Sequence, residues 1–315
     1  MRLGARVEAM QQGASAPSND DIAEQFMFTP AVLGQIFVDG LGLSAIYVLI
    51  ALGFTLLFGI MRVVNFAHGA FAMLGGYTLY YFYGGFGLPY LLAAPLAALV
   101  VACVGLIFER VVYRFFYQRM FQSMIGLLGL DMAIMYMAVI VWNAQERSVP
   151  PSTDALLQLG ALVVPEQKLV IAAIAAVALL AFYLFTHYSR YGLAMRAAAQ
   201  DVAIAEAQGV NSTAIYRLAF FIAIFMAALA GGFYAQTYAL SPFVGEPQLM
   251  IAFVVVILGG MGSIPGVALG SLLLGLANSF LGTFYGSAAS IFVSFGAVIV
   301  LLVFRPWGLL GTKEA

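Results

Sequence analysis

The stretch HYSRYGLAMRAAAQDVAIAEAQGVNSTAIYR, residues 187–217, decides how this chain is organised. It lies in the second half of a very apolar sequence and holds three of the thirteen Lys and Arg residues, together with Asp201 and Glu206. Charged side chains and unpaired backbone groups are costly in the hydrocarbon of a membrane. The stretch is therefore predicted to protrude into water between two membrane spans.

A helix is predicted inside this stretch, from Ala194 to Gln208. The segment is rich in Ala, Met, Arg, Gln and Glu, which favour helix, and Gly209 is expected to end it. Asn211 and Ser212 can then cap the next helix. A short polar helix between two spans suits the docking of a partner, although an ordinary solvated loop would account for the composition equally well.

Composition places the whole chain in the membrane. Of its 315 residues, 63% are hydrophobic and 9% are charged, whereas soluble domains are about one quarter charged. These values predict an all-α, polytopic integral membrane protein. A net charge of -1 leaves no basic patch for nucleic acid. One cysteine, Cys103, and two distant histidines predict no internal disulfide, no metal site and no cofactor.

A membrane span needs about 20 apolar residues, or about 17 at the short end. Nine segments approach this length, which predicts about nine spans, with about eight to ten as the range. They cover residues 41–60, 66–82, 88–108, 124–142, 169–185, 215–238, 249–261, 266–284 and 288–304. The seventh is too short for an upright helix and the second contains Gly75 and Gly76, so broken helices are expected at both. Broken helices at membrane depth tend to mark a transport path.

The distribution of Lys and Arg predicts the orientation. When loops are numbered alternately, one side receives nine basic residues, and the other receives only Arg147 and Lys168. The nine are Arg62, Arg110, Arg114, Arg119, Arg190, Arg196, Arg217, Arg305 and Lys313. The positive-inside rule makes their side cytoplasmic, which puts the C-terminus inside and the N-terminus outside. Arg2 and Arg6 oppose this assignment weakly.

The predicted domains are a polar tail over residues 1–35, expected to be disordered, and a single transmembrane domain over 36–311. The beginning of the tail has no apolar core, so it is not expected to act as a secretory signal. Residues 187–217 form the protruding segment of the transmembrane domain. The outer loop over 143–168 is expected to carry a short surface helix around residues 155–159.

A few residues are candidates for a transport path. Asn65 is placed to cap a half-helix whose N-terminus suits an anionic group, and His68 would lie on its first turn. Asp131 lies near the middle of its span, where a lipid-facing carboxylate costs about 2.5 kcal/mol or more. It is therefore expected to face water, a partner or another helix. For Asn65 and His68, roles in capping and packing remain as plausible as a contact with the substrate.

Glycines spaced by four, at Gly262, Gly266 and Gly270, are expected on one helix face in close contact with a neighbouring helix. The chain has no phosphate-binding loop, which needs Gly directly before Lys and then Ser or Thr. Lys168 follows Gln167 and Lys313 follows Thr312. If ATP drives transport, a separate subunit must supply the nucleotide site.

Four stretches resemble the permeases of branched-chain amino acid ABC transporters, the Liv family. They are RYGLAMRAAAQDVAIAEAQGVN at 190–211, the segment 40–77 with its NFAHG element, LGGMGSIPGVALG at 258–270, and FRPWGLLG at 304–311. Together they span almost the whole chain after the tail. Two features depart from the family pattern: the longer tail, and Asp131, where the family usually has an uncharged residue.

The resemblance implies a transport subunit of the inner membrane, not an enzyme. It also implies a second, homologous permease, two ATPase subunits and a periplasmic solute-binding protein as partners. Residues 187–217 would then be a coupling segment that docks on an ATPase, with Arg196, Asp201, Glu206 and Gly209 as its candidate residues. The implied substrate is a branched-chain or related small amino acid.

Two alternatives stay open from the sequence. Relatives of this type also carry urea, short amides or small carboxylates, and selection commonly lies in the binding protein. A proton-coupled secondary transporter would use His68 and Asp131, but no inverted repeat is apparent and the coupling segment would have no purpose. No paired carboxylates, histidine cluster or activated nucleophile indicates an enzyme.

Overall fold

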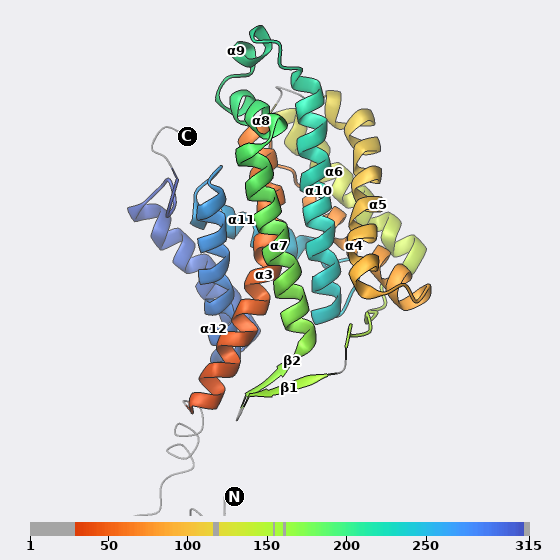
Figure 1. Cartoon of the computed structure of the whole chain (residues 1–315), viewed down its shortest axis with the longest axis vertical. Coiled ribbons are helices and arrows are strands. Elements are labelled where there is room, and N and C mark those ends of the chain that lie inside the picture. The colour runs from red at the N-terminus through yellow and green to blue at the C-terminus, as the bar shows by residue number, and fades with distance from the viewer. Residues whose placement is uncertain (1–28, 116–119, 154, 160–161, 312–315) are drawn as a thin grey trace, which may run out of the picture.

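The protein is a bundle of helices with one small hairpin at one end and a protruding helical segment at the other (Figure 1). The computed structural model describes residues 29–115, 120–153, 155–159 and 162–311. The long helices are α3 (Pro30–Met61), α5 (Tyr90–Val111), α6 (Met120–Trp142), α7 (Glu166–Tyr188), α10 (Ser212–Thr237) and α12 (Ile264–Phe304). The shorter helices are α4 (His68–Leu79), α8 (Arg190–Gln200), α9 (Val202–Ala207) and α11 (Gly245–Gly259).

Six helical segments are long and apolar enough to cross a membrane, among the residues that the structure describes. They lie in α3, α5, α6, α7, α10 and the first part of α12. The predicted class, a polytopic helical membrane protein, agrees with this finding. The predicted count of about nine spans is not confirmed, because the three remaining apolar segments form α4, α11 and the second part of α12, which are shorter helices.

The expectation of an irregular helix is confirmed at the second segment, whereas the seventh segment forms a short, regular helix. Helix α4 has 12 residues and continues into a π-helical turn, Tyr80–Gly85. Helix α11 has 15 residues and ends at Gly260, whose φ of 104° lies in the region that favours glycine. Helix α12 is bent at Gly286, which has a φ of 85°. A regular helix of 15 residues is only about 22 Å long, less than the thickness of a bilayer core.

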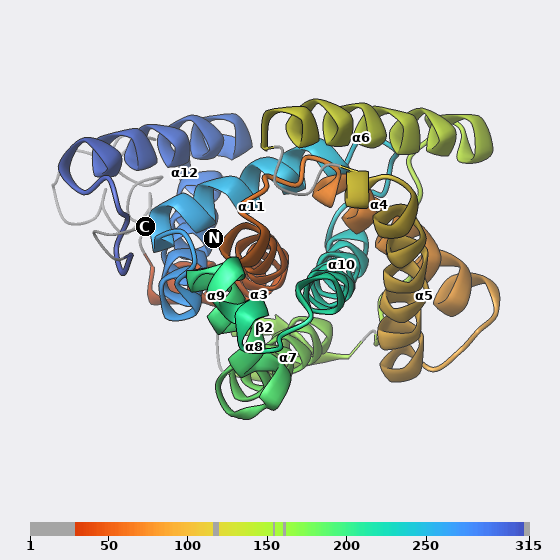
Figure 2. The same cartoon turned by 90° about the horizontal axis from the view of Figure 1, so that it is seen from above.

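Helices α3 and α10 form the centre of the bundle, and the other helices surround them (Figure 2). Close packing around α10 depends on small residues. A Cβ atom built on Gly231 of α10 would collide with the carbonyl group of Ala72 in α4, and one on Gly53 of α3 would collide with the backbone of Ala223 in α10. Small residues let helix backbones approach this closely. By contrast, α6 and α7 are largely exposed.

The predicted helix around residues 155–159 is wrong. Residues Leu156–Leu159 form strand β1, which pairs antiparallel with β2, Leu162–Pro165, so that Leu156 lies opposite Pro165. Val163 and Val164 are β-branched and favour extended backbone. The hairpin lies at the end of the bundle opposite α8 and α9 (Figure 1).

Helix α3 begins at Pro30, inside the segment predicted as a tail. Thr29 caps it, with its hydroxyl oxygen 3.5 Å from the Val32 backbone nitrogen. Residues 30–35 are therefore helical, and α3 begins before residue 36, the predicted start of the transmembrane domain. The rest of the predicted tail, residues 1–28, lies outside the described residues.

Candidate transport pathway and coupling surface

The protruding segment is a pair of helices instead of the single predicted helix. Helix α8 ends at Gln200 and α9 begins at Val202, because Asp201 adopts extended backbone and caps α9. The Asp201 carboxylate accepts a hydrogen bond of 3.0 Å from the Ile204 N–H. Aspartate is among the residues that most favour an N-cap, which is why the helix breaks at this position.

The end of the segment follows the prediction. Gly209 has a φ of 87°, and Asn211 caps α10 by accepting a 3.0 Å hydrogen bond from the Ala214 N–H. Ser212 is the first residue of α10, and its hydroxyl bonds the Glu206 carboxylate.

Arg196 joins α8 to the end of α7. Its guanidinium lies 3.1 Å from the His187 ring nitrogen Nδ1 and donates to the His187 carbonyl oxygen, also at 3.1 Å. Three of the four candidate coupling residues, Arg196, Asp201 and Glu206, thus have partners within the segment or at its edge. These contacts hold the exposed segment in one shape.

Helix α4 begins deep in the bundle, and His68 is its first residue. His68 is fully buried, with Nε2 3.0 Å from the Ile50 carbonyl oxygen and its ring edge-on to Phe54. The prediction that Asn65 caps this half-helix with its side chain is wrong. Ala67 is the N-cap and has no side-chain bond, whereas Asn65 accepts from the His68 N–H through its backbone oxygen, at 3.2 Å.

The start of α4 touches the start of α11. A Cβ atom on Gly69 would collide with the Gly245 carbonyl group, so the two short helices meet by their first turns. Asn65 and Gln248 near these helix starts are almost fully buried, and their side-chain amides have no hydrogen-bond partner among the described residues.

Asp131 finds its partner on another helix. It is half-buried in α6, and its carboxyl lies beside the Ala70 backbone N–H in the first turn of α4. The first N–H groups of a helix have no partner within the helix, and the helix dipole favours a carboxylate there. Asp131, and not the Asn65 side chain, is thus the polar group placed at the N-terminus of α4.

The three glycines spaced by four do not share one helix face. Gly262 precedes α12, has a φ of 83°, and donates through its N–H to the Thr55 hydroxyl at 3.1 Å. Gly266 and Gly270 lie in α12 and pack against α11, since a Cβ on either would meet the backbone of Gly259. Gly262 is excluded from the helix because Ser263 caps α12, accepting from the Gly266 N–H at 3.1 Å.

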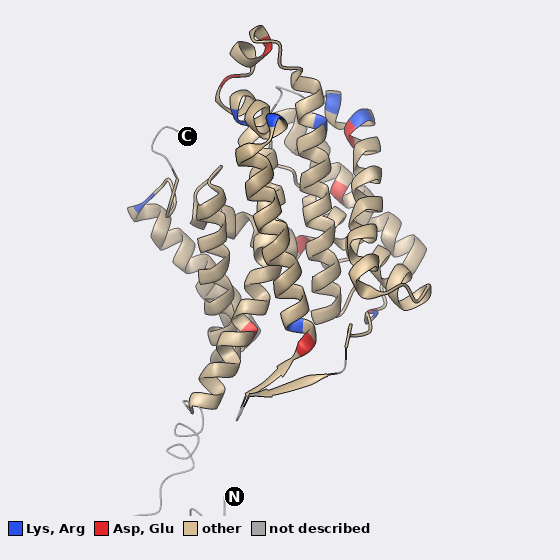
Figure 3. Ribbon diagram, viewed as in Figure 1, with Lys and Arg blue, Asp and Glu red and all other residues tan. Residues whose placement is uncertain are grey.

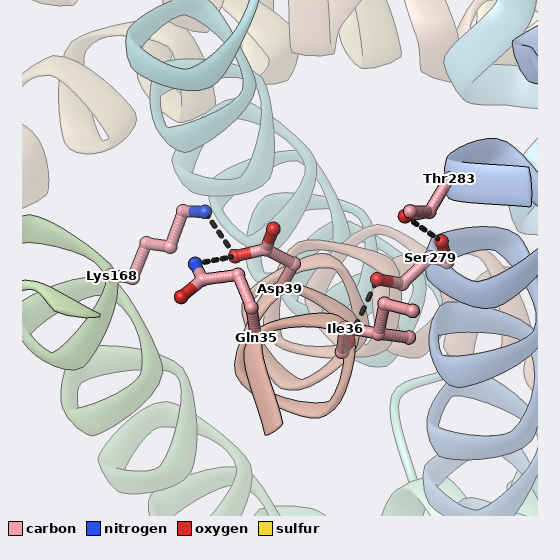
Figure 4. Close-up of polar contacts among 6 residues, drawn as sticks. All are labelled: Gln35, Ile36, Asp39, Lys168, Ser279 and Thr283. Carbon is pink, nitrogen blue, oxygen red and sulfur yellow. Dashed lines mark hydrogen bonds and ion pairs between the residues drawn. The ribbon is translucent and has the colours of Figure 1, made fainter. Parts of the chain in front are cut away.

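Sequence analysis missed a polar site at the hairpin end of the bundle. Lys168 of α7 and Asp39 of α3 form an ion pair, with Nζ 2.5 Å from Oδ1, and Gln35 donates to the same oxygen at 3.1 Å (Figure 4). On a third helix, α12, Ser279 donates to the Ile36 carbonyl oxygen at 2.7 Å. Asp39 precedes the first predicted apolar segment, which begins at residue 41, so the apolar pattern does not point to it.

Two neighbouring cavities open at this site. The charged cavity, about 260 Å³, is lined by Asp39, Gly42, Leu43, Lys168, Ile171, Thr237, Tyr238, Asn278, Ser279, Gly282 and Thr283. The aromatic cavity, about 750 Å³, is lined chiefly by Tyr47, Tyr234, Tyr238, Phe243, Met250, Ile251, Val254, Leu274, Ile291 and Phe295. They share Leu43, Tyr238, Asn278 and Gly282, so the two cavities lie side by side. Burial raises the pKa of the Tyr238 phenol, which therefore stays protonated and able to donate a hydrogen bond.

Charge is distributed unequally between the two ends of the bundle. Most of the Lys and Arg residues that the structure describes lie at the end that carries α8 and α9, and few lie at the hairpin end (Figure 3). The predicted two-sided distribution of basic residues is therefore reproduced in space.

Comparison with known proteins identifies the kind of protein that has this arrangement. A family model described as "Branched-chain amino acid transport system / permease component" matches residues 36–304. The chain is 32% identical to the high-affinity branched-chain amino acid transport system permease protein BraD of Pseudomonas aeruginosa, covering 89% of this chain and 96% of BraD. Identity to the corresponding LivH protein of Escherichia coli is also 32%, over 93% of this chain and 99% of LivH.

A more distant relative is the permease protein LivM of Salmonella typhimurium, at 22% identity over 89% of this chain and 71% of LivM. No solved structure shows a significant match to the chain. The resemblance in the four motifs therefore extends over nearly the whole sequence, and the chain belongs to the family of permease components of branched-chain amino acid transport systems.

Proposed function

We propose that this protein is the transmembrane permease subunit of an ABC importer that carries branched-chain amino acids across the inner membrane. The observation that carries the proposal is the family match over residues 36–304, with relatives that are named as branched-chain amino acid permeases and covered almost end to end. A permease subunit needs a path through its helices and a surface for the subunit that supplies energy.

The pair α8–α9 is the surface that would dock on an ATPase. It protrudes beyond the bundle, and Arg196, Asp201 and Glu206 hold its shape through contacts within the chain (Figure 1). A rigid protrusion of this kind can transmit a movement, whereas a flexible loop would absorb it. Exposed Leu193 and Ile204 on α8 and α9 offer apolar contacts to a partner.

The complete transporter would contain a second permease, two ATPase subunits and a periplasmic binding protein. The existence of both LivH-type and LivM-type relatives supports a pair of homologous permeases. In this assembly the α8–α9 end faces the cytoplasm, in keeping with its basic residues, and the hairpin end faces the binding protein.

Purification and reconstitution test this function. Tagged permease expressed with its neighbours is expected to bring two ATPase subunits with it, and the reconstituted complex is expected to take up leucine only with ATP and a binding protein. Uptake that needs no ATPase and follows a proton gradient would contradict the proposal. Uptake of urea or a short amide, with none of leucine, would keep the transporter class and overturn the substrate.

A further inference from the structure

The ion pair between Asp39 and Lys168 has room for additional partners. Their side chains are 36% and 30% exposed, so both are reachable from the charged cavity. Lys168 and Gln35 bond the same carboxylate oxygen, Oδ1, and Oδ2 takes part in neither bond (Figure 4). An ammonium group has three donors, and a carboxylate can accept about four hydrogen bonds. Each member of the pair therefore retains capacity for a ligand.

The charges in this cavity select a class of ligand. Among the described residues that line it, Asp39 and Lys168 are the charged ones, and their charges cancel. A ligand with one net charge would be attracted by one member of the pair and repelled by the other. A zwitterion offers each member its opposite charge, and it enters without adding a net charge to a partly desolvated site.

The adjoining aromatic cavity suits an apolar group on the same ligand. Tyr238 and Asn278 stand on the boundary between the two cavities. Asn278 donates to the Tyr47 hydroxyl at 3.1 Å and accepts from the Ser290 and Ser294 hydroxyls at 2.8 Å and 2.5 Å. These bonds fix Asn278 between α3 and the two parts of α12. Among the described residues that line the aromatic cavity, Glu246 is the one charged residue, and apart from Asn278 the others are apolar, aromatic or hydroxyl-bearing.

We propose that the charged cavity binds the two charged groups of a zwitterionic amino acid, the ammonium group at Asp39 and the carboxylate group at Lys168, and that the aromatic cavity receives its apolar side chain. This inference rests on the proposed function and assigns it a site. The ligand adds one charge pair at each residue, and it can pass onward because both side chains stay partly exposed.

Single substitutions test the assignment in the reconstituted complex with leucine as the substrate. Asp39→Asn and Lys168→Gln keep the size of each side chain and remove its charge. Each is expected to lower leucine uptake at least about tenfold, which corresponds to about 1.4 kcal/mol, a modest loss for a charged hydrogen bond. Glu166→Gln is the matched control, because Glu166 lies at the same end, bonds Thr153 and lines neither cavity.

The double variant D39K/K168D separates ligand binding from a purely mechanical role, since the pair also ties α3 to α7. If the pair only holds the helices together, exchange of the charges restores uptake to within about twofold of the wild type, and the proposal is overturned. If it binds the ligand, uptake stays low, because the charges are reversed relative to the aromatic cavity. Normal uptake in both single variants would also overturn it.

A measurement on the wild-type complex keeps the proposal testable when the variants fail to assemble. In nanodiscs without binding protein, leucine is expected to give a saturation-transfer NMR signal. Isopentylamine, which lacks the carboxylate, and 4-methylpentanoate, which lacks the ammonium, should give less than about one tenth of it. Equal signals from all three would overturn the proposal. Failure of the wild type to import leucine with its binding protein would instead count against the proposed function.

Discussion

At the scale of single residues, Asp131 shows how a carboxyl group inside a helical bundle can be placed beside the start of another helix. Its carboxyl lies beside the Ala70 N–H at the start of α4. Asp131→Asn keeps an oxygen acceptor at this position, and we expect this variant to assemble and transport much as the wild type does. Asp131→Leu removes the acceptor and is expected to lower the free energy of unfolding by about 1 kcal/mol, the usual cost of losing a cap.

Thermal unfolding of the purified permease and leucine uptake would measure the two effects. Loss of uptake in an Asp131→Asn variant that assembles normally would show instead that the negative charge itself is needed for transport. If the Asp131→Leu variant were as stable as the wild type, the contact between Asp131 and α4 would make no measurable contribution to stability.

Gly231 sets the distance between α10 and α4. A Cβ atom there would collide with the carbonyl group of Ala72. Gly231→Ala is therefore expected to destabilise the protein by about 1–3 kcal/mol, as overpacking of a tight core does. Gly129→Ala on α6 is the matched control, because a Cβ at Gly129 meets nothing within 4 Å. Thermal unfolding should separate the two variants; equal stability would contradict the close contact.

At the scale of elements, the shape of the protruding segment, residues 187–217, depends on two local signals. Asp201 starts α9, and Gly209 ends the segment with a φ of 87°, where a β-branched residue is strained by about 1–3 kcal/mol. Gly209→Val and Asp201→Ala are therefore expected to leave the protein in the membrane while uptake falls and ATP hydrolysis by the complex continues. The exposed Gln208→Ala variant is the control. Normal uptake in both test variants would contradict a coupling role.

Sequence patterns predicted the elements whose signals are local. Apolar runs predicted the long helices, and the short apolar segments predicted α4 and α11. Gly209 predicted the end of the protruding segment, and Asn211 predicted the start of α10. Asp201 was available as a cap signal, but the helix-forming residues on both sides of it suggested one helix. The hairpin was missed because a short apolar segment fits either a strand or a helix.

The polar sites were harder to predict because they are made by residues far apart in the sequence. Asp39 and Lys168 are separated by 129 positions, and Asp131 meets Ala70 across the bundle. No spacing rule connects such pairs. Only packing of the helices brings them together, so the sequence could supply the candidates but not the partners.

At the scale of the whole molecule, the two ends of the bundle are chemically different, and this difference predicts its orientation. The α8–α9 end is rich in Lys and Arg, and the hairpin end is not (Figure 3). Because basic residues are retained in the cytoplasm, we expect the hairpin outside and α8–α9 inside. Gln158 on β1 and Gln208 after α9 are exposed reporters of the two ends.

Single cysteines at these positions measure the orientation. In a Cys103→Ser background, Gln158→Cys should react with a membrane-impermeant maleimide in cells whose outer membrane alone is permeable, and Gln208→Cys should react only after the inner membrane is opened. Both positions lie outside the six apolar spans, so lipid does not protect either. The reverse labelling pattern would mean that the protein has the opposite orientation in the membrane. The charged cavity would then lie on the cytoplasmic side, and α8–α9 would lie where no ATPase could reach it. Labelling of both positions while the inner membrane is closed would put the two ends of the bundle on the same side of that membrane. A bundle with the hairpin and α8–α9 at opposite ends does not allow this.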